Sequence, residues 1–195
     1  MNSKGFNFKK YITKEEINNL DLGKYSGPIK LIETKKDLDN ACKEIIKCPI
    51  IGIDTETKPS FKKGQINSVA ILQLATDKIV YIIRLKFVEI NQALASIFSN
   101  TNIVKVGIAV KDDLKDLKKL FFFEHQNVID LNILASNLGF ESIGAKKLSA
   151  LVLGIRISKR QQISNWESKF LTNAQLDYAA TDAWICREIY LRLTK

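Results

Sequence analysis

Two carboxylates, Asp54 and Glu56, stand two residues apart at the end of the apolar run Ile50–Ile53. The run is rich in isoleucine and carries no charge, which predicts a strand buried on both faces. On an extended strand the two acids would point to the same side, where they repel each other and lose hydration. A divalent cation such as Mg²⁺ or Mn²⁺, which takes oxygen ligands, would offset both costs. The alternative is that both acids begin a solvated loop.

A third acid, Asp113, follows the segment Ile103–Val110, which is expected to form another strand. Asp113 then stands in the first turn of the next helix, where it could supply a further metal ligand. Its neighbour Asp112 has the same local setting, and helix capping or interaction with the helix dipole would explain either residue. The local pattern leaves metal binding and capping both open.

The last candidates, Tyr178 and Asp182, are four residues apart in a segment of helical character. Residues at this spacing share one helix face. The small side chains of Ala179, Ala180 and Ala183 would let this helix approach a sheet closely. The alternative is that both side chains are simply exposed. A functional interpretation of this pair therefore depends on the acids that precede it in the sequence.

These residues need a frame of strands and helices, which the apolar periodicity predicts. Strands are expected at Ile29–Ile32, Ile50–Asp54, Ser68–Thr76, Ile79–Ile83, Ile103–Val110 and Val128–Asp130. Helices are expected after Thr34 and at Val88–Phe98, Asp113–Phe122, Leu131–Leu138, Lys146–Leu153 and Asn173–Leu193. A meander of three strands, followed by strands that alternate with helices, indicates a mixed α/β sheet covered by helices. We expect one domain over residues 28–195, preceded by an N-terminal extension at residues 1–27.

The chain of 195 residues carries a formal net charge of +9, and many of its lysines come in adjacent pairs. This balance suggests a polyanionic partner such as nucleic acid, although a solvated basic surface would have the same composition. The single histidine, His125, excludes His-rich zinc sites, and the spacing of the three cysteines indicates reduced thiols. No apolar run could cross a bilayer and no signal-peptide core follows Met1, so a cytoplasmic protein without membrane contact is expected.

The order of these features resembles the DEDD superfamily of 3′-5′ exonucleases, in the branch with tyrosine in the last motif. Within that branch the chain is similar to the ribonuclease D and Werner-type exonuclease domains, and more so to the Werner type. Five motifs carry the resemblance over about residues 29–193: Gly52–Pro59, Val69–Leu74, Val106–Ile108 with Asp113 and Leu117, Ser164–Glu167 with Leu171 and Thr172, and Tyr178–Ala183. The family pattern sets its aspartate four residues before a leucine, which selects Asp113 rather than Asp112.

The resemblance implies a ribonuclease H-like α/β fold, with a mixed five-stranded sheet flanked by helices, and a nuclease that uses two divalent metal ions, Mg²⁺ or Mn²⁺. It implies that Asp54 bridges both ions, that Glu56 and Asp182 complete one site, and that Asp113 serves the other. Tyr178 would hold the attacking water, since a tyrosine with an ordinary pKa of about 10 is a poor base at neutral pH. Nucleoside 5′-monophosphates would leave a single-stranded or recessed 3′ end, of DNA in preference to RNA.

Several residues near these motifs are candidates for substrate contact, because basic side chains bind phosphates and aromatic rings stack on bases. The candidates are Thr55, Lys58, Phe61, Lys62, Lys63, Lys159, Arg160 and Trp166. For both aromatic residues packing is the alternative, and for Trp166 it is the favoured one. A protein partner could recruit the domain. The other interpretations are an RNA-processing enzyme of the ribonuclease D type, an inactive nucleic-acid-binding module, and an endonuclease or integrase of the same fold.

Overall fold

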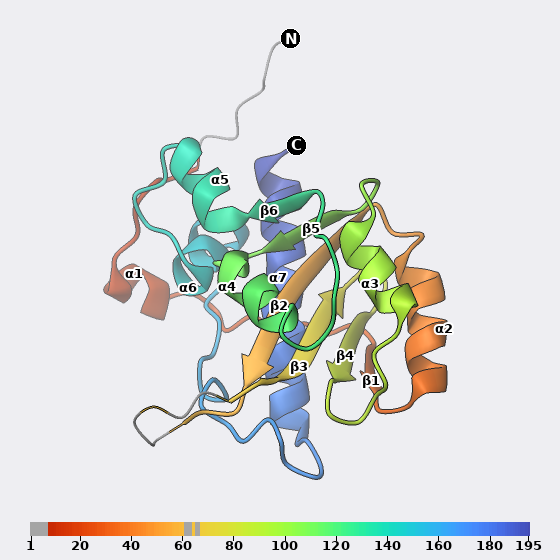
Figure 1. Ribbon diagram of the computed structural model, residues 1–195. Coiled ribbons are helices and arrows are strands. Elements are labelled where there is room, and N and C mark those ends of the chain that lie inside the picture. Colours follow the sequence, from red (N-terminus) through yellow and green to blue (C-terminus); the bar gives the residue numbers. More distant parts are fainter. Residues whose placement is uncertain (1–7, 61–63, 65–66) are drawn as a thin grey trace.

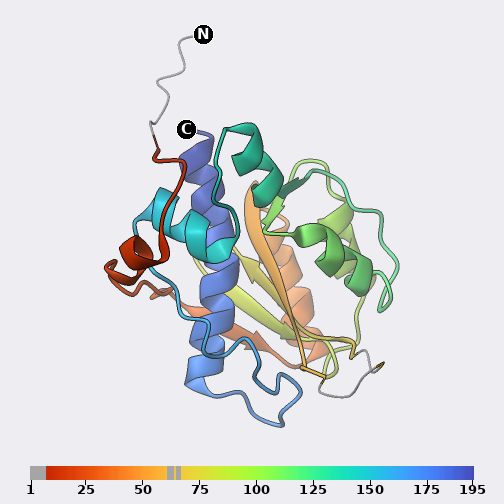
Figure 2. The same ribbon diagram turned by 90° about the vertical axis from the view of Figure 1, so that its left-hand side faces the viewer.

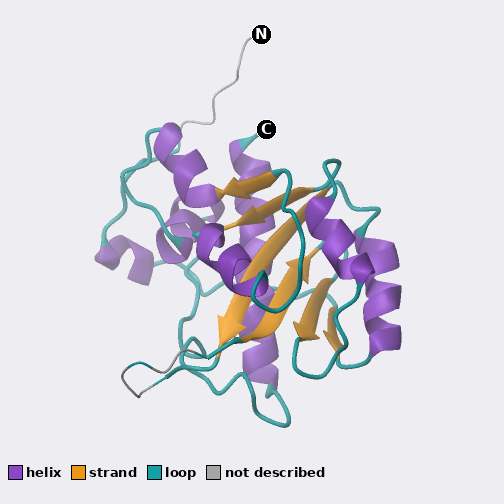
Figure 3. Ribbon diagram, viewed as in Figure 1, coloured by secondary structure: helices purple, strands orange, loops and turns teal. Residues whose placement is uncertain are grey.

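A six-stranded mixed sheet forms the centre of the computed structural model, which describes residues 8–60, 64 and 67–195. The strands lie in the order β1-β4-β3-β2-β5-β6 (Figures 1 and 3). They are β1 (Ile29–Ile32), β2 (Ile50–Thr57), β3 (Val69–Ala75), β4 (Val80–Arg84), β5 (Val104–Gly107) and β6 (Val128–Asp130). The mixed α/β class is confirmed, but the expected count of five strands is wrong. The sheet gains its sixth strand because both short edge segments form parallel ladders, β1 with β4 and β6 with β5.

β2 lies in the middle of the sheet, antiparallel to β3 and parallel to β5. Every residue of β3 and β4 is buried, as expected for strands covered on both faces. Because side chains alternate along a strand, β2 directs Ile53 and Thr55 to one face and Asp54 and Glu56 to the other. The two acids therefore share one face of the central strand.

Helices cover both faces of this sheet. α2 (Lys35–Ile45), α3 (Gln92–Ser99) and α4 (Val110–Leu117) pack on one face, and α7 (Asn173–Leu193) crosses the other (Figure 2). α5 (Leu131–Asn137) and α6 (Ala145–Leu148), which continues into a π-helical turn (Ser149–Leu153), pack against α7 in a second apolar cluster. α1 (Lys14–Asn18) lies beside α6. Within the described ranges, no helix is both long and apolar enough to cross a membrane.

A sharp turn between β5 and α4 moves both elements from their expected bounds. β5 ends at Gly107 rather than at Val110, because Ala109 has a left-handed backbone conformation with φ 56° that interrupts the strand. α4 therefore begins at Val110, earlier than the expected start. Asp113 remains in the first turn of this helix, as the sequence predicts.

α7 begins where the sequence predicts, because Thr172 and Gln175 form a reciprocal capping box. The helix then crosses the sheet at very short range. A methyl group added to Gly52 on β2 would lie 2.0 Å from the backbone oxygen of Ala183. This contact holds Asp182, the residue before Ala183, beside the central strand.

We expect Gly52→Ala to destabilise the protein and to displace Asp182. The added methyl group would force α7 away from β2, and overpacking of this kind typically costs about 1–3 kcal/mol. Urea unfolding followed by circular dichroism should show a lower midpoint. A variant as stable as the wild type would show that α7 can withdraw from the sheet without cost.

Candidate active site

Three carboxylates meet where the end of β2 faces α7. One oxygen from each of Asp54, Glu56 and Asp182 lies within 4.8 Å of the other two. The first two share a face of β2 because of their two-residue spacing. The third reaches them because α7 contacts the backbone of β2 at Gly52. The structure thus brings Asp182 to a pair of acids that lies far from it in the sequence.

Asp113 approaches this cluster from α4. The hydroxyl of Thr55 on β2 donates a hydrogen bond to a carboxylate oxygen of Asp113. Asp113 is half-buried, whereas Asp112 is exposed. The charge of Asp113 contributes to raising the pKa of both Asp54 and Glu56. Asp113, and not Asp112, is therefore the acid of α4 that acts on the cluster, although it lies outside the three-acid group and does not line the cavity beside it.

A cavity of about 200 Å³ lies at the cluster. Tyr178, one helical turn before Asp182, lines it together with the acids of β2. The Tyr178 hydroxyl donates a hydrogen bond to Asp182, which stabilises the carboxylate. Lys159, from the segment that leads to α7, lines the same cavity. The cavity therefore combines acids, a phenol and an ammonium group.

Burial raises the pKa of the acids on β2 far above their ordinary values. Loss of hydration is the largest cause for Glu56, and the charges of Asp182 and Asp113 add to it, so that its pKa rises to about 9. The pKa of Asp54 lies well above its usual range, first through burial and then through repulsion by its three acidic neighbours. Both side chains bind protons strongly when no cation is present.

The pKa values of the other two acids rise less because each has a group that favours the charged form. Burial raises the pKa of Asp182 to about 7, and the hydrogen bond from Tyr178 and the charge of Lys159 oppose the rise. Burial raises the pKa of Asp113 to about 6 against the hydrogen bond from Thr55. Carboxylate oxygens crowded in this way suit a hard divalent cation, which would replace the protons.

These pKa values predict that the metal-free protein loses stability as the pH rises. Glu56 titrates near 4.5 when unperturbed and near 9 in the folded protein, so between these values the folded state binds more protons than the unfolded chain. The free energy of unfolding therefore falls as the pH rises through this window. Calorimetry in EDTA between about pH 5 and about pH 9 should show a falling melting temperature. Added Mg²⁺ or Mn²⁺ should raise it most at the upper end.

Glu56→Gln is the matched control, because it removes this titration and keeps the side-chain volume. Its melting temperature in EDTA should depend less on pH than that of the wild type. A wild-type melting temperature that stays constant or rises across the window would contradict the expected burial of the acids.

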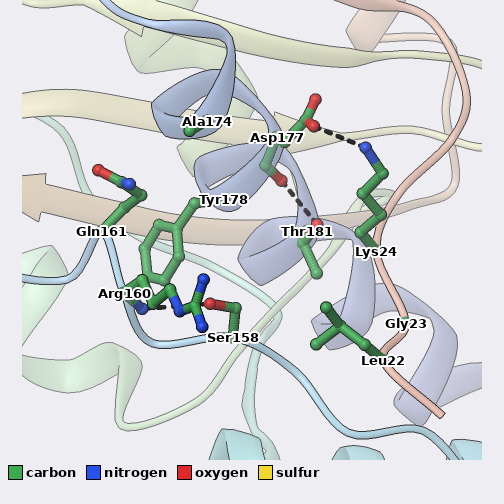
Figure 4. Close-up of a pocket in the computed structure, with 10 residues that line it drawn as sticks. All are labelled: Leu22, Gly23, Lys24, Ser158, Arg160, Gln161, Ala174, Asp177, Tyr178 and Thr181. Atoms are coloured by element: carbon green, nitrogen blue, oxygen red, sulfur yellow. Dashed lines mark hydrogen bonds and ion pairs between the residues drawn. The ribbon is translucent and has the colours of Figure 1, made fainter.

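The predicted phosphate-binding residues lie at several places around the cavity. Lys159 lines it directly. Arg160 lines a neighbouring pocket of about 260 Å³ whose wall also includes Tyr178 (Figure 4). Lys58 follows β2 and pairs with Glu167 at 3.8 Å. Three further candidates, Phe61, Lys62 and Lys63, lie outside the described residues.

Trp166 is a packing residue, and its assignment to substrate binding is wrong. Its side chain is 1% exposed, within the apolar cluster that α7 forms on the sheet. Its ring lies 5.9 Å from that of Tyr178, measured between centroids. A ring this deeply buried has no face on which a base could stack. It supports the position of Tyr178 instead.

Two cavity residues with polar side-chain atoms, Gln162 and Cys186, were not predicted from the sequence. Cys186 stands four residues after Asp182 on α7, and its thiol donates to the Asp182 carbonyl oxygen at 3.2 Å. The same spacing that links Tyr178 to Asp182 could have identified it. Gln162 gives no such signal, because it lies in an irregular segment whose path is set by tertiary contacts.

The chain is similar to known nucleases over most of its length. A family described as 3′-5′ exonuclease matches residues 29–195. A 3′-5′ exonuclease of Arabidopsis thaliana is 30% identical over 168 residues, which cover 83% of this chain and 56% of that protein. A ribonuclease D of Acidiphilium cryptum is 28% identical over 162 residues, which cover 82% of this chain and 41% of that protein. The chain thus spans about half of these relatives or less.

The fold has a close counterpart among solved structures. The crystal structure of the Nibbler EXO domain of Aedes aegypti superposes with a TM-score of 0.79 at 26% identity and covers 88% of this chain and 90% of that one. The ribonuclease H-like architecture that the motifs implied is confirmed by this likeness.

Proposed function

Because the chain belongs to the family of 3′-5′ exonucleases, we propose that it hydrolyses nucleic acid from the 3′ end with two divalent metal ions, Mg²⁺ or Mn²⁺, and releases nucleoside 5′-monophosphates. The observation that carries this proposal is the convergence of buried acids and Tyr178 at one cavity. Residues 28–195 would form the exonuclease domain and residues 1–27 an extension of it.

The four acids would divide the metal ions between them. Asp54 would contact both, Glu56 and Asp182 would complete one site, and Asp113 would serve the other. The hydrogen bond from Thr55 supports this role, since it fixes the orientation of the Asp113 carboxylate. When bound, such ions lower the pKa of coordinated water and stabilise the charge that develops on phosphoryl oxygens.

Tyr178 would orient the attacking water by accepting a hydrogen bond from it, since the single O–H of the phenol is donated to Asp182. Burial raises the pKa of its phenol above the ordinary value, and the charge of Asp182 raises it further. A phenol with a raised pKa stays protonated at neutral pH, so it cannot act as the general base. The packing of Trp166 against its ring supports a fixed orientation for the hydroxyl.

The reaction is a displacement at the last phosphodiester of the strand. The water oxygen attacks phosphorus, the bond to O3′ of the penultimate nucleotide breaks, and that oxygen takes up a proton. The released nucleoside 5′-monophosphate keeps the water oxygen. Lys159 would balance the charge of the scissile phosphate from the cavity wall. Lys58, Lys62, Lys63 and Arg160 would contact neighbouring phosphates, which gives affinity without sequence preference.

We favour DNA as the substrate, because the motifs are more similar to the Werner type than to ribonuclease D. The ribonuclease D relative supports RNA as the second candidate. A partner protein could bring the enzyme to either substrate.

A degradation assay tests the proposal directly. The substrates are 5′-labelled single-stranded DNA, duplex DNA with a recessed 3′ end, and RNA of the same sequence, each with Mg²⁺, Mn²⁺ or EDTA. A metal-dependent ladder that shortens from the 3′ end is the expected result, and the substrate degraded fastest decides between DNA and RNA. Absence of cleavage of all three would reject the exonuclease and favour an inactive binding module.

A further inference from the structure

The N-terminal segment, which precedes the family match at residues 29–195, forms one wall of a groove beside the catalytic cavity. The groove has a volume of about 390 Å³ and lies between α1 and α6, which Figure 2 shows next to each other. Ile12, Ile17 and Ile143 give it apolar walls. Four lysines also line it: Lys14, Lys146, Lys147 and Lys159.

The groove adjoins the catalytic cavity. Ala145 and Lys159 line both of them. A chain bound along the groove would therefore lead to the reacting phosphate.

None of the four lysines forms an ion pair within the described part of the protein. Lysines elsewhere differ, such as Lys24 with Asp177 at 2.8 Å and Lys86 with Glu167 at 2.5 Å. Like charges gathered in one groove repel each other, and a polyanion relieves that repulsion. Lysines beside apolar walls suit single-stranded nucleic acid, which presents both phosphates and base surfaces.

Tertiary contacts fix the N-terminal segment against the domain. The backbone oxygen of Lys10 accepts hydrogen bonds from the N–H groups of Glu141 and Ser142 at 2.9 and 3.2 Å. After α1, Arg156 donates its N–H to the oxygen of Asp21 at 2.9 Å. Between these anchors Ile12 and Ile17 pack on Ala150. Lys14 is therefore held at the edge of the groove by a rigid support.

We propose that residues 8–27 and α6 form the binding groove for the single-stranded part of the substrate on the 5′ side of the scissile phosphate. This inference rests on the proposed function. A 3′-5′ exonuclease that removes one nucleotide has only that nucleotide beyond the scissile phosphate. A groove that leads away from the acids therefore holds the strand on the 5′ side.

Strand binding in EDTA tests the groove without requiring hydrolysis. Fluorescence anisotropy of a 5′-labelled single strand of about 15 nucleotides is measured against salt for the wild type and for Lys14→Ala/Lys147→Ala. Both lysines are exposed, so the variant should fold, and a melting curve checks this. Loss of two phosphate contacts should weaken binding by roughly tenfold or more at low salt and reduce the salt slope by about 1.4.

Lys36→Ala/Lys43→Ala is the matched control, since both residues are exposed on α2 across the sheet. It changes the net charge equally and should bind like the wild type. If the two double variants weaken binding equally, or if neither does, the groove is not the strand-binding site. Should the groove variant alone bind weakly while the wild type degrades no substrate, the groove is confirmed as a nucleic-acid site and only the proposed hydrolysis fails.

A comparison of kcat/KM between a long and a short substrate then tests whether the groove holds the 5′ side of the strand. The kcat/KM for a strand of about 15 nucleotides, divided by that for a dinucleotide, should fall at least about tenfold in Lys14→Ala/Lys147→Ala. A ratio equal to that of the wild type would overturn the assignment of the groove to the 5′ side.

Discussion

Asp182→Asn should abolish hydrolysis and leave the fold intact. The substitution removes one negative charge from the three-acid cluster. Single electrostatic contacts to a transition state are worth about 10²–10³ in rate, so we expect a loss of about a thousandfold or more. The metal-free variant should melt no lower than the wild type, because a repulsive charge beside Asp54 and Glu56 is gone. Single-turnover hydrolysis and calorimetry measure the two effects, and Asp54→Ala should behave in the same way.

Glu188→Gln provides the control for a carboxylate on the same helix. Its side chain pairs with Arg187 at 2.9 Å and does not line the catalytic cavity. It should keep wild-type turnover. Substantial activity in Asp182→Asn would remove this residue from the metal site and with it the proposed division of ligands.

Tyr178→Phe should slow hydrolysis by about a hundredfold while the protein still binds metal ions. The substitution keeps the ring that packs on Trp166 and removes only the hydroxyl. Groups that position or transfer protons typically contribute about 10²–10⁴ in rate, and we expect the hydroxyl to contribute at the lower end of this range. Loss of the hydrogen bond should also raise the pKa of Asp182, because that bond favours the carboxylate.

Tyr190→Phe, a change of the same type later in α7, should leave the rate unaltered. Titration calorimetry with Mn²⁺ separates loss of metal from loss of rate in both variants. A Tyr178→Phe enzyme that hydrolyses DNA as fast as the wild type would show that the hydroxyl serves only the structure.

Local spacing made much of the site predictable. Asp54 and Glu56 share a face because a strand repeats every two residues, and Tyr178 faces the same side as Asp182 because a helix nearly repeats every four. The start of α7 follows from the hydrogen bonds that Thr172 and Gln175 exchange across three residues. All of these depend on neighbours in the chain, so the sequence alone contains the information.

Tertiary structure decided what depends on contact between distant segments. The sequence could not distinguish a stacking Trp166 from a packed one, because its exposure is set by α7 and the sheet. Nor could it show that the extension before residue 28 supplies Lys14 to a groove with Lys147, since that depends on where α1 rests. The sequence by itself thus determined which residues could do the chemistry and which of them share a face of one strand or helix. The burial of each side chain and the route to the acids were decided by packing, because both depend on which surfaces exclude water from one another.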